Sequence, residues 1–221
     1  MEAPDYIIWH IDESEDELLS SLEHPEYFAD KVARLKPGSA RMLEVLAVRR
    51  ALKELCYGQE QQVLYTAEGA PYLDRRIYGS DQVPAVSISH TKDYAAVILA
   101  EAPVGIDIER RGERVQRVVS HFLTSDELVY LELSASMHPD LSADEALSLA
   151  LHLAWSAKEA AFKVLGRDYY DLQHLTGIQH IDWQLRTLSL RVQGRELPLL
   201  VHFDYTDDYV LGWVLENDPH S

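Results

Sequence analysis

The sequence predicts an α+β fold. Residues 39–56 and 142–165 carry apolar residues at helical spacing. Residues 85–109 contain short runs rich in β-branched residues, and four further runs of this kind follow Gly177. The two kinds of pattern therefore predict a fold that mixes helices and strands.

The first half of the chain is expected to begin with a strand and to continue into helices. Residues 5–11 alternate apolar and polar side chains, as strands with one buried face do. Two acidic, helix-like stretches follow, before the turn at 37–39 that starts the helix 39–56. We then expect a short strand at 61–66 and a turn-rich loop at 69–80.

The second half is expected to be richer in strands. Thr124-x-x-Glu127 and Ser142-x-x-Glu145 are capping boxes that predict helix starts, and another helix is expected near Val115. The predicted strands are 85–90, 94–100, 104–109, 178–185, 188–192, 199–205 and 209–215. Ala102-Pro103 is the one plausible seam, and it divides the chain into domains 1–103 and 104–221.

Composition excludes several classes of protein. The chain has 221 residues and a formal net charge of −17, whereas general nucleic-acid binding requires the opposite sign. No apolar run reaches the roughly 20 residues of a membrane span. The acidic N-terminal stretch, without Lys or Arg up to Glu26, is unlike a secretory signal. One cysteine, Cys56, fits the reducing cytoplasm, where we expect the protein.

The strand 104–109 carries two acidic residues on one face. Side chains alternate along a strand, so Asp107 and Glu109 point the same way, beside Gly105, which leaves space. Two carboxylates together suit Mg²⁺, which binds through a few carboxylates, waters and phosphate oxygens. A solvated outer face of the strand is the alternative interpretation.

The helix 142–165 is apolar nearly all round and is expected to be buried. Five of the six polar residues between Ala146 and Leu165 follow steps of three or four and so form one line, which must face partners, water or a site. They are Ser148, His152, Ser156, Glu159 and Lys163. An ordinary surface pair is the alternative for Glu159 and Lys163, and a satisfied core histidine is the more typical role for His152.

Two further segments carry polar or basic groups. Residues 87–92, Ser-Ile-Ser-His-Thr-Lys, combine hydroxyls, an imidazole and an ammonium that suit a phosphate, although a polar hairpin tip is the alternative. Four arginines follow the acidic strand and can attract an acidic partner, or they can form a solvated helix face. They are Arg110, Arg111, Arg114 and Arg117.

Taken in order, these segments resemble the 4′-phosphopantetheinyl transferase superfamily, and the chain length is similar to its surfactin-synthetase-activating type. The resemblance covers about Arg41 to Lys163 and depends on three segments, with Glu109 and Glu159 fifty residues apart. They are Ser87-Ile88-Ser89-His90, Val104-Gly105-Ile106-Asp107-Ile108-Glu109 and Trp155-Ser156-Ala157-Lys158-Glu159-Ala160-Ala161-Phe162-Lys163. Gly69-Ala70-Pro71 resembles the family's G-K-P segment but lacks its Lys.

The resemblance implies two similar α/β halves related by a pseudo-twofold axis, with the active site in the cleft between them. It implies Mg²⁺-dependent transfer of phosphopantetheine from coenzyme A to a serine of an apo carrier protein, with release of adenosine 3′,5′-bisphosphate. A chain that carries both halves is expected to act as a monomer. Domain 1–103 would supply coenzyme A contacts, and domain 104–221 the metal site and the carrier contacts.

The family match also implies residue roles. Asp107, Glu109 and Glu159 would hold Mg²⁺, with Glu159 also the base for the incoming serine and Lys163 placed to neutralise or protonate the leaving phosphate. Coenzyme A would be bound by Arg41, Ser89, His90, Lys158 and Lys163, with Arg49, Lys31 and Arg34 as further candidates. Arg75 or Arg76 would replace the missing Lys at Ala70.

The carrier protein would meet residues 115–128 by family position. The four arginines would attract it, and its apolar contacts would be Val118, Val119, Phe122 and Leu123. Two other functions compete with the transferase. One is a non-catalytic homologue that binds coenzyme A or a carrier protein, and the other is a Mg²⁺-dependent nucleotide pyrophosphate hydrolase.

Overall fold

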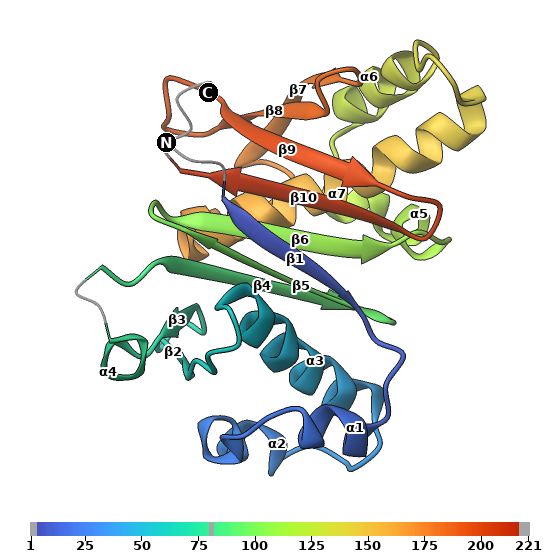
Figure 1. Ribbon diagram of the computed structural model, residues 1–221. Helices are drawn as coiled ribbons and strands as arrows, with labels where there is room; N and C mark the ends of the chain where they lie inside the picture. Colours follow the sequence, from blue (N-terminus) through green and yellow to red (C-terminus); the bar gives the residue numbers. More distant parts are fainter. Residues whose placement is uncertain (1–3, 80–81, 217–221) are drawn as a thin grey trace. The chain divides into compact units, whose positions relative to one another are not determined.

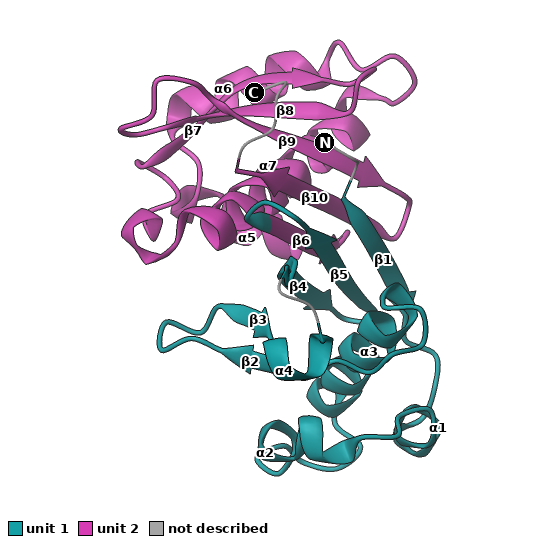
Figure 2. Cartoon of the chain, turned by 60° about the vertical axis from the view of Figure 1, so that its left-hand side comes forward, with its two compact units in different colours: residues 1–104 teal, residues 105–221 magenta. Residues whose placement is uncertain are grey.

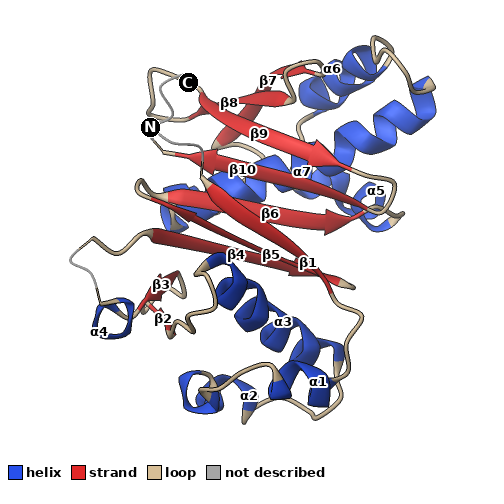
Figure 3. Cartoon of the chain, viewed as in Figure 1, coloured by secondary structure: helices blue, strands red, loops and turns tan. Residues whose placement is uncertain are grey.

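A computed structural model describes residues 4–79 and 82–216 of the chain. The chain folds into two compact units, Met1–Val104 and Gly105–Ser221, and each has its own hydrophobic core (Figures 1 and 2). Each unit contains helices and an antiparallel sheet (Figure 3). The predicted α+β class is therefore confirmed, whereas the pseudo-twofold relation of two similar halves stays a prediction.

Unit 1 is built around a three-stranded sheet with the order β1-β5-β4. Helix α3 packs on this sheet. Its N-cap is Ser39, whose hydroxyl accepts the Met42 N–H, and its inward residues include Leu46 and Ala47, which are fully buried. The elements are β1 (Asp5–His10), α1 (Glu15–Ser20), the 3₁₀ helix η1 (Pro25–Tyr27), α2 (Ala29–Val32), α3 (Ala40–Leu55), β2 (Val63–Tyr65), β3 (Pro71–Leu73), α4 (Arg75–Tyr78), β4 (Ala85–Thr91) and β5 (Tyr94–Ala100).

The predicted loop at 69–80 is wrong for most of its length. The segment contains β3, which pairs antiparallel with β2, and the short helix α4. The Asp74 carboxylate caps α4 by accepting the Arg76 N–H, and Gly79 ends the helix at a φ of +73°. Ser80 lies outside the described residues.

Unit 2 is built around a five-stranded sheet with the order β6-β10-β9-β8-β7. The strands β7 to β10 are antiparallel neighbours. The elements are β6 (Val104–Arg110), α5 (Arg114–Val118), the 3₁₀ helix η2 (Val119–His121), α6 (Ser125–Ala135), α7 (Ala143–Leu165), the 3₁₀ helix η3 (Arg167–Tyr169), β7 (Thr176–Asp182), β8 (Thr187–Val192), β9 (Leu199–Tyr205) and β10 (Tyr209–Leu215).

Strand β7 ends earlier than predicted. We expected residues 178–185, but β7 ends at Asp182, whose carboxylate accepts the N–H groups of Gln184 and Leu185. This side-chain turn competes with continued strand pairing, and Arg186 then adopts a φ of +53°.

Helix α7 of unit 2 is buried, as the sequence predicts. Its capping box at Ser142 and Glu145 is present, and it packs on β10 and β9. Residues on every side of it are buried, including Leu149, Ala154 and Ala160. None of the helices in the described ranges combines the length and hydropathy that a bilayer span requires.

His152 on α7 is a satisfied core histidine, which is the role that its apolar surroundings predict. Its Nε2 accepts the Gly112 N–H at 3.1 Å, and its Nδ1 lies 2.7 Å from the Ser148 carbonyl, so the ring proton belongs on Nδ1. Burial lowers the pKa of His152 below the ordinary 6.5. A second proton on the ring would displace the Gly112 N–H.

This histidine predicts a loss of stability in mild acid. Below about pH 6.5 the unfolded chain binds a proton that the native ring does not bind, so the free energy of unfolding falls as the pH decreases. Above about pH 6.5, His152 adds nothing to the pH dependence of the free energy of unfolding. His152→Gln is expected to flatten this dependence in urea denaturation between about pH 5 and 7.5. The exposed His121 provides the control His121→Gln, which should keep the wild-type slope. An unchanged slope for His152→Gln would contradict the assignment.

Candidate active site

The acidic strand β6 is buried on both faces. Val104, Ile106 and Ile108 are buried as predicted, but Asp107 on the other face is also only 5% exposed. A Cβ atom on Gly105 would lie 2.0 Å from the carbonyl oxygen of Ala160, so this face of the strand is in backbone contact with α7. A solvated outer face is therefore wrong, and the space beside Gly105 is filled by the helix.

The polar line of α7 faces β6, as the sequence predicts of a polar line on a buried helix. The Ser156 hydroxyl donates to the Asp107 carbonyl at 2.8 Å. Lys163 Nζ donates to Asp107 Oδ1 at 2.9 Å and to the Ile106 carbonyl at 2.6 Å. The Lys163 side chain is 25% exposed, so the pair with Asp107 is partly open to solvent.

Glu109 is held by an indole group from the same helix. Trp155 Nε1 donates to Glu109 Oε1 at 3.0 Å. The Phe122 ring packs edge-on against Trp155, with 5.0 Å between the ring centroids. The tryptophan of the motif thus fixes one oxygen of the carboxylate, which leaves the other oxygen available to a ligand.

The negative charges of Asp107, Glu109 and Glu159 interact and shift the pKa values of the two glutamates. Burial raises the pKa of Glu109 to about 7, and the Asp107 and Glu159 charges add to this rise, while Trp155 and Arg114 oppose it. Burial and the Asp107 charge also raise the pKa of Glu159, which Lys163 lowers. Repulsion between partly buried carboxylates is relieved when a cation binds among them.

The donor set fits a hard divalent cation. Three carboxylates supply oxygen ligands of the kind that Mg²⁺ prefers, and their mutual repulsion favours a positive ion. As they stand, no three His, Cys, Asp or Glu side chains in the described part of the chain form a ready-made metal site. Asp107 Oδ1 instead contacts the Lys163 ammonium.

The structure does not support the expected contact of Lys158 with coenzyme A. Lys158 is fully buried, and its ammonium contacts the Glu127 carboxylate and backbone carbonyls within unit 2. Adjacent helix positions differ by about 100° in direction. Lys158 therefore points away from the line that contains Glu159 and Lys163.

In unit 1, the structure brings two of the expected phosphate-binding residues together. Arg41 at the start of α3 contacts the His90 ring on β4. Glu44 Oε2 lies 3.1 Å from both Arg41 Nη1 and His90 Nδ1. Ser89 is buried, and because strand side chains alternate, it points to the opposite face of β4 from His90.

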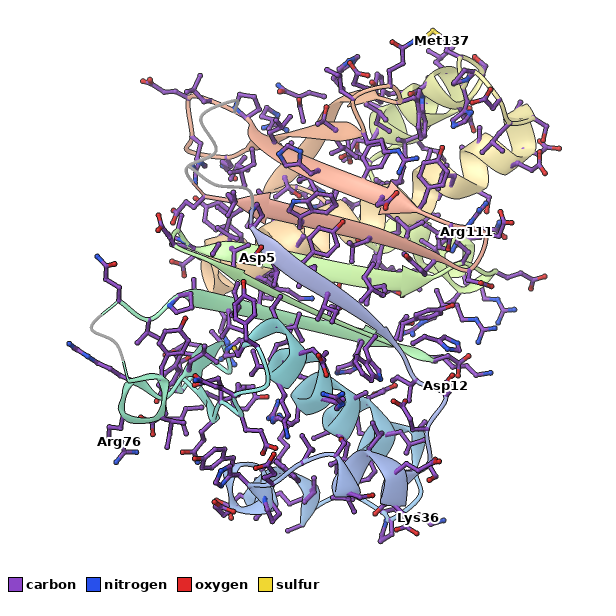
Figure 4. The ribbon with its side chains drawn as sticks, viewed as in Figure 1. Asp5, Asp12, Lys36, Arg76, Arg111 and Met137 are labelled. Carbon is purple, nitrogen blue, oxygen red and sulfur yellow. The ribbon has the colours of Figure 1, made fainter. Side chains whose placement is uncertain are left out.

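Three other basic residues of unit 1 that were expected to bind coenzyme A contact neighbouring side chains instead. Arg49 is buried, and its Nη2 lies 3.5 Å from the Tyr65 hydroxyl. Lys31 Nζ lies 4.1 Å from the centre of the Tyr65 ring. Arg76 projects outward from α4 (Figure 4) and pairs with Asp74 at 2.6 Å, which makes it a poor replacement for a lysine at Ala70.

The four arginines are only partly arranged as expected. Arg111 follows β6 (Figure 4) and donates to the Thr206 carbonyl at 3.1 Å, and Arg117 pairs with Glu113 at 3.1 Å. Arg110 and Arg114 are exposed. Phe122 and Leu123 are buried in the core, so their prediction as apolar carrier contacts is wrong. Val118 and Val119 are half-buried.

Three functional neighbours lie outside the predicted set of ligands. Trp155 orients Glu109, Ser156 holds the backbone of Asp107, and Glu44 joins Arg41 to His90. Ser156 could be found from its place in the polar line of α7. The contact of Trp155 with Glu109 joins residues 46 positions apart, and no local pattern indicates it.

Comparison with known proteins identifies the family. The family model described as the 4′-phosphopantetheinyl transferase superfamily matches residues 103–214, about half of the chain. The match includes β6 and all of α7, the two elements that carry the acidic residues and Lys163. The chain belongs to the 4′-phosphopantetheinyl transferase superfamily.

Two curated proteins are similar over longer stretches. The 4′-phosphopantetheinyl transferase gsp of Aneurinibacillus migulanus is 24% identical over 142 residues, which cover 63% of this chain. The 4′-phosphopantetheinyl transferase psf-1 of Bacillus pumilus is 28% identical over 163 residues, which cover 72% of this chain. The matched regions span 54% and 63% of the lengths of these two relatives.

Proposed function

We propose that this chain transfers the 4′-phosphopantetheine group from coenzyme A to a serine of an apo carrier protein and releases adenosine 3′,5′-bisphosphate. The names of both relatives and the superfamily membership support this activity. One structural observation carries most weight. The Lys163–Asp107 pair joins α7 to β6 and brings two residues of distant motifs into one partly open site.

The reaction needs charge neutralisation and positioning more than covalent help. Asp107, Glu109 and Glu159 would hold Mg²⁺, which when bound neutralises charge on the pyrophosphate. Trp155 keeps one oxygen of Glu109 in place, and Ser156 fixes the backbone at Asp107.

Glu159 and Lys163 would act on the serine proton and on the leaving adenosine 3′,5′-bisphosphate. The serine oxygen forms a new bond to the phosphorus that carries pantetheine, and Glu159 accepts the serine proton. Its raised pKa suits a base that must bind a proton during the step. The bond to the bridging oxygen breaks, and that oxygen leaves with adenosine bisphosphate. The Lys163 ammonium, one quarter exposed, neutralises the leaving phosphate.

The remaining contacts are assigned by family position. We assign Arg41 and His90 to the 3′-phosphate of coenzyme A, and their contact supports this. The buried Ser89 lies on the opposite face of β4, so its contact with that phosphate stays a prediction of the resemblance. The carrier protein would dock on residues 115–128, which we call the carrier segment. The exposed Arg110, Arg114 and Arg117, in or just before this segment, would attract the carrier to a chain whose formal net charge is −17.

An intact-mass assay tests the function. Apo carrier proteins of the fatty-acid, polyketide and nonribosomal-peptide classes are incubated with the chain, coenzyme A and Mg²⁺. We expect at least one carrier to gain the mass of a phosphopantetheine group, and Asp107→Ala to abolish the gain. Binding of coenzyme A without any mass gain would instead indicate a non-catalytic homologue. Release of the bisphosphate without a carrier would indicate a hydrolase.

The contact between Trp155 and Glu109 predicts a metal phenotype. Trp155→Phe keeps an aromatic ring against Phe122 but removes the indole N–H that holds Glu109. Loss of such a group beside a ligand typically weakens metal binding by about tenfold or more, so the Mg²⁺ concentration for half-maximal rate should rise by this factor. Trp183→Phe is the control, because that indole donates to the Ser134 carbonyl instead. An unchanged Mg²⁺ requirement in Trp155→Phe would exclude the proposed role.

A further inference from the structure

The Lys158 side chain forms a fully buried junction in unit 2. Its Nζ donates to the carbonyls of Phe122 at 2.7 Å, Leu172 at 2.8 Å and Thr176 at 3.1 Å. The same atom lies 2.7 Å from Glu127 Oε1. An ammonium has three N–H donors, so these four acceptors saturate it. Lys158 therefore has no donor left for a ligand.

Glu127 extends this junction to two further elements. Its Oε2 accepts the backbone N–H and the hydroxyl of Thr124, which completes the capping box of α6. Its Oε1 also accepts the Ile178 N–H at 2.9 Å, near the start of β7. One carboxylate thus fixes the start of α6, the start of β7 and the lysine of α7. We call Lys158 and Glu127 the buried pin.

A buried ion pair is an inefficient source of stability. Removing two charges from water costs several kcal/mol each, and apolar replacements of similar volume are often neutral or stabilising. Desolvation accordingly lowers the pKa of Lys158, against the pull of Glu127. Stability alone is thus a weak reason for this pair, and its contacts indicate what else it does.

The contacts of the buried pin converge on residues 122–124, which directly follow the exposed Ser120 and His121. Lys158 donates to the Phe122 carbonyl, and Glu127 accepts the Thr124 N–H. Both ends of residues 122–124 are therefore hydrogen-bonded to the buried pin. Gln173 adds two bonds to the same stretch, to the carbonyls of Ser120 and Leu123. Residues 119–121 form only the 3₁₀ turn η2, which has no side-chain cap. Side-chain donors from α7 and from residues 171–176 therefore hold this part of the carrier segment.

We propose that Lys158 and Glu127 are positioning residues. They hold residues 122–124, and with them the adjoining turn 119–121, whose Ser120 and His121 are exposed, in the shape on which the carrier protein docks. The proposal rests on the proposed transferase function. It assigns the lysine of the W-S-x-K-E motif to carrier recognition rather than to coenzyme A. Loss of the buried pin is therefore expected to weaken use of the carrier while binding of coenzyme A stays intact.

The test compares Lys158→Met, Glu127→Gln and the double variant. Lys158→Met alone leaves a buried carboxylate without its cation, whereas the double variant removes both charges and is expected to fold. Glu127→Gln keeps the three carbonyl contacts of Lys158 but leaves its buried ammonium without the partner carboxylate. Glu132→Gln, exposed on the same helix α6, is the matched control. Thermal unfolding first shows which variants fold.

Kinetics and calorimetry separate the two substrates. In the double variant we expect the KM for the carrier to rise about tenfold, as for loss of roughly one hydrogen bond to a charged group. We expect kcat at saturating carrier and the Kd for coenzyme A to stay within about twofold of wild type, a change well below the effect of one such bond. A raised Kd for coenzyme A with an unchanged carrier KM would overturn the proposal.

Hydrogen exchange provides a readout that needs no activity. Amides of residues 119–124 should exchange faster in the double variant, whereas those of β6 should keep their wild-type protection. Unchanged exchange in residues 119–124 would overturn the proposal. A wild-type chain that modifies no carrier would overturn the proposed function instead, and the exchange result would still decide whether the buried pin orders this segment.

Discussion

Glu159→Gln is expected to reduce the rate of phosphopantetheine transfer by a factor on the order of 10³, because it removes a metal ligand and the base together. The carboxamide keeps the size of the half-buried side chain, so the fold should persist. Lys163 would lose an acidic neighbour while its contacts with Asp107 and the Ile106 carbonyl remain. Initial rates at saturating coenzyme A, Mg²⁺ and carrier measure the effect.

The control for this variant is Glu132→Gln. Glu132 is exposed on α6, and the substitution changes the net charge by the same amount without touching the site. It is expected to keep the wild-type rate. If Glu159→Gln retained a third or more of that rate while its unfolding temperature matched wild type, Glu159 could be neither base nor ligand.

The second large effect concerns folding. Gly105→Ala would place a Cβ atom 2.0 Å from the Ala160 carbonyl oxygen and 3.1 Å from Val164 Cγ2. The first contact is with helix backbone, so β6 and α7 must separate rather than a side chain rotate. We expect a loss of about 3 kcal/mol or more in the free energy of unfolding, at the upper end of overpacking effects. Urea denaturation measures it.

Gly112→Ala is the matched substitution. No atom lies within 4 Å of the Cβ position at Gly112, and alanine keeps the N–H that His152 accepts. Its unfolding free energy is expected to stay within about 0.5 kcal/mol of wild type. A Gly105→Ala protein as stable as Gly112→Ala would show that β6 and α7 are not packed this closely.

Local patterns predicted the helices and strands well where a single period dominates. The strand 94–100 and the strands 199–205 and 209–215 have the predicted bounds, and α7 begins at its capping box. Prediction was poorest at 69–80, where a three-residue strand and a one-turn helix follow one another. Elements this short carry too few residues for a period, and their pairing partner β2 decides their structure.

The site was predictable in composition but less so in detail. A clear period placed the acidic residues on one face of β6 and the polar line on one face of α7, and only the family resemblance predicted that these residues share a site. The role of Gly105 could not, since a missing side chain indicates either open space or a close neighbour, and only the position of Ala160 decides. The buried position of Lys158 could not be predicted either, because its ammonium donates to carbonyls that are distant in the sequence.

The proposed function requires Asp107, Glu109 and Glu159 to hold a divalent ion together. Titration of the chain with Mn²⁺ in the presence of coenzyme A, followed by electron paramagnetic resonance of the free ion, tests this directly. Wild type is expected to bind one ion per chain, with binding lost in both Asp107→Asn and Glu159→Gln. Undiminished Mn²⁺ binding in these two variants, each shown to be folded, would contradict the proposed metal site.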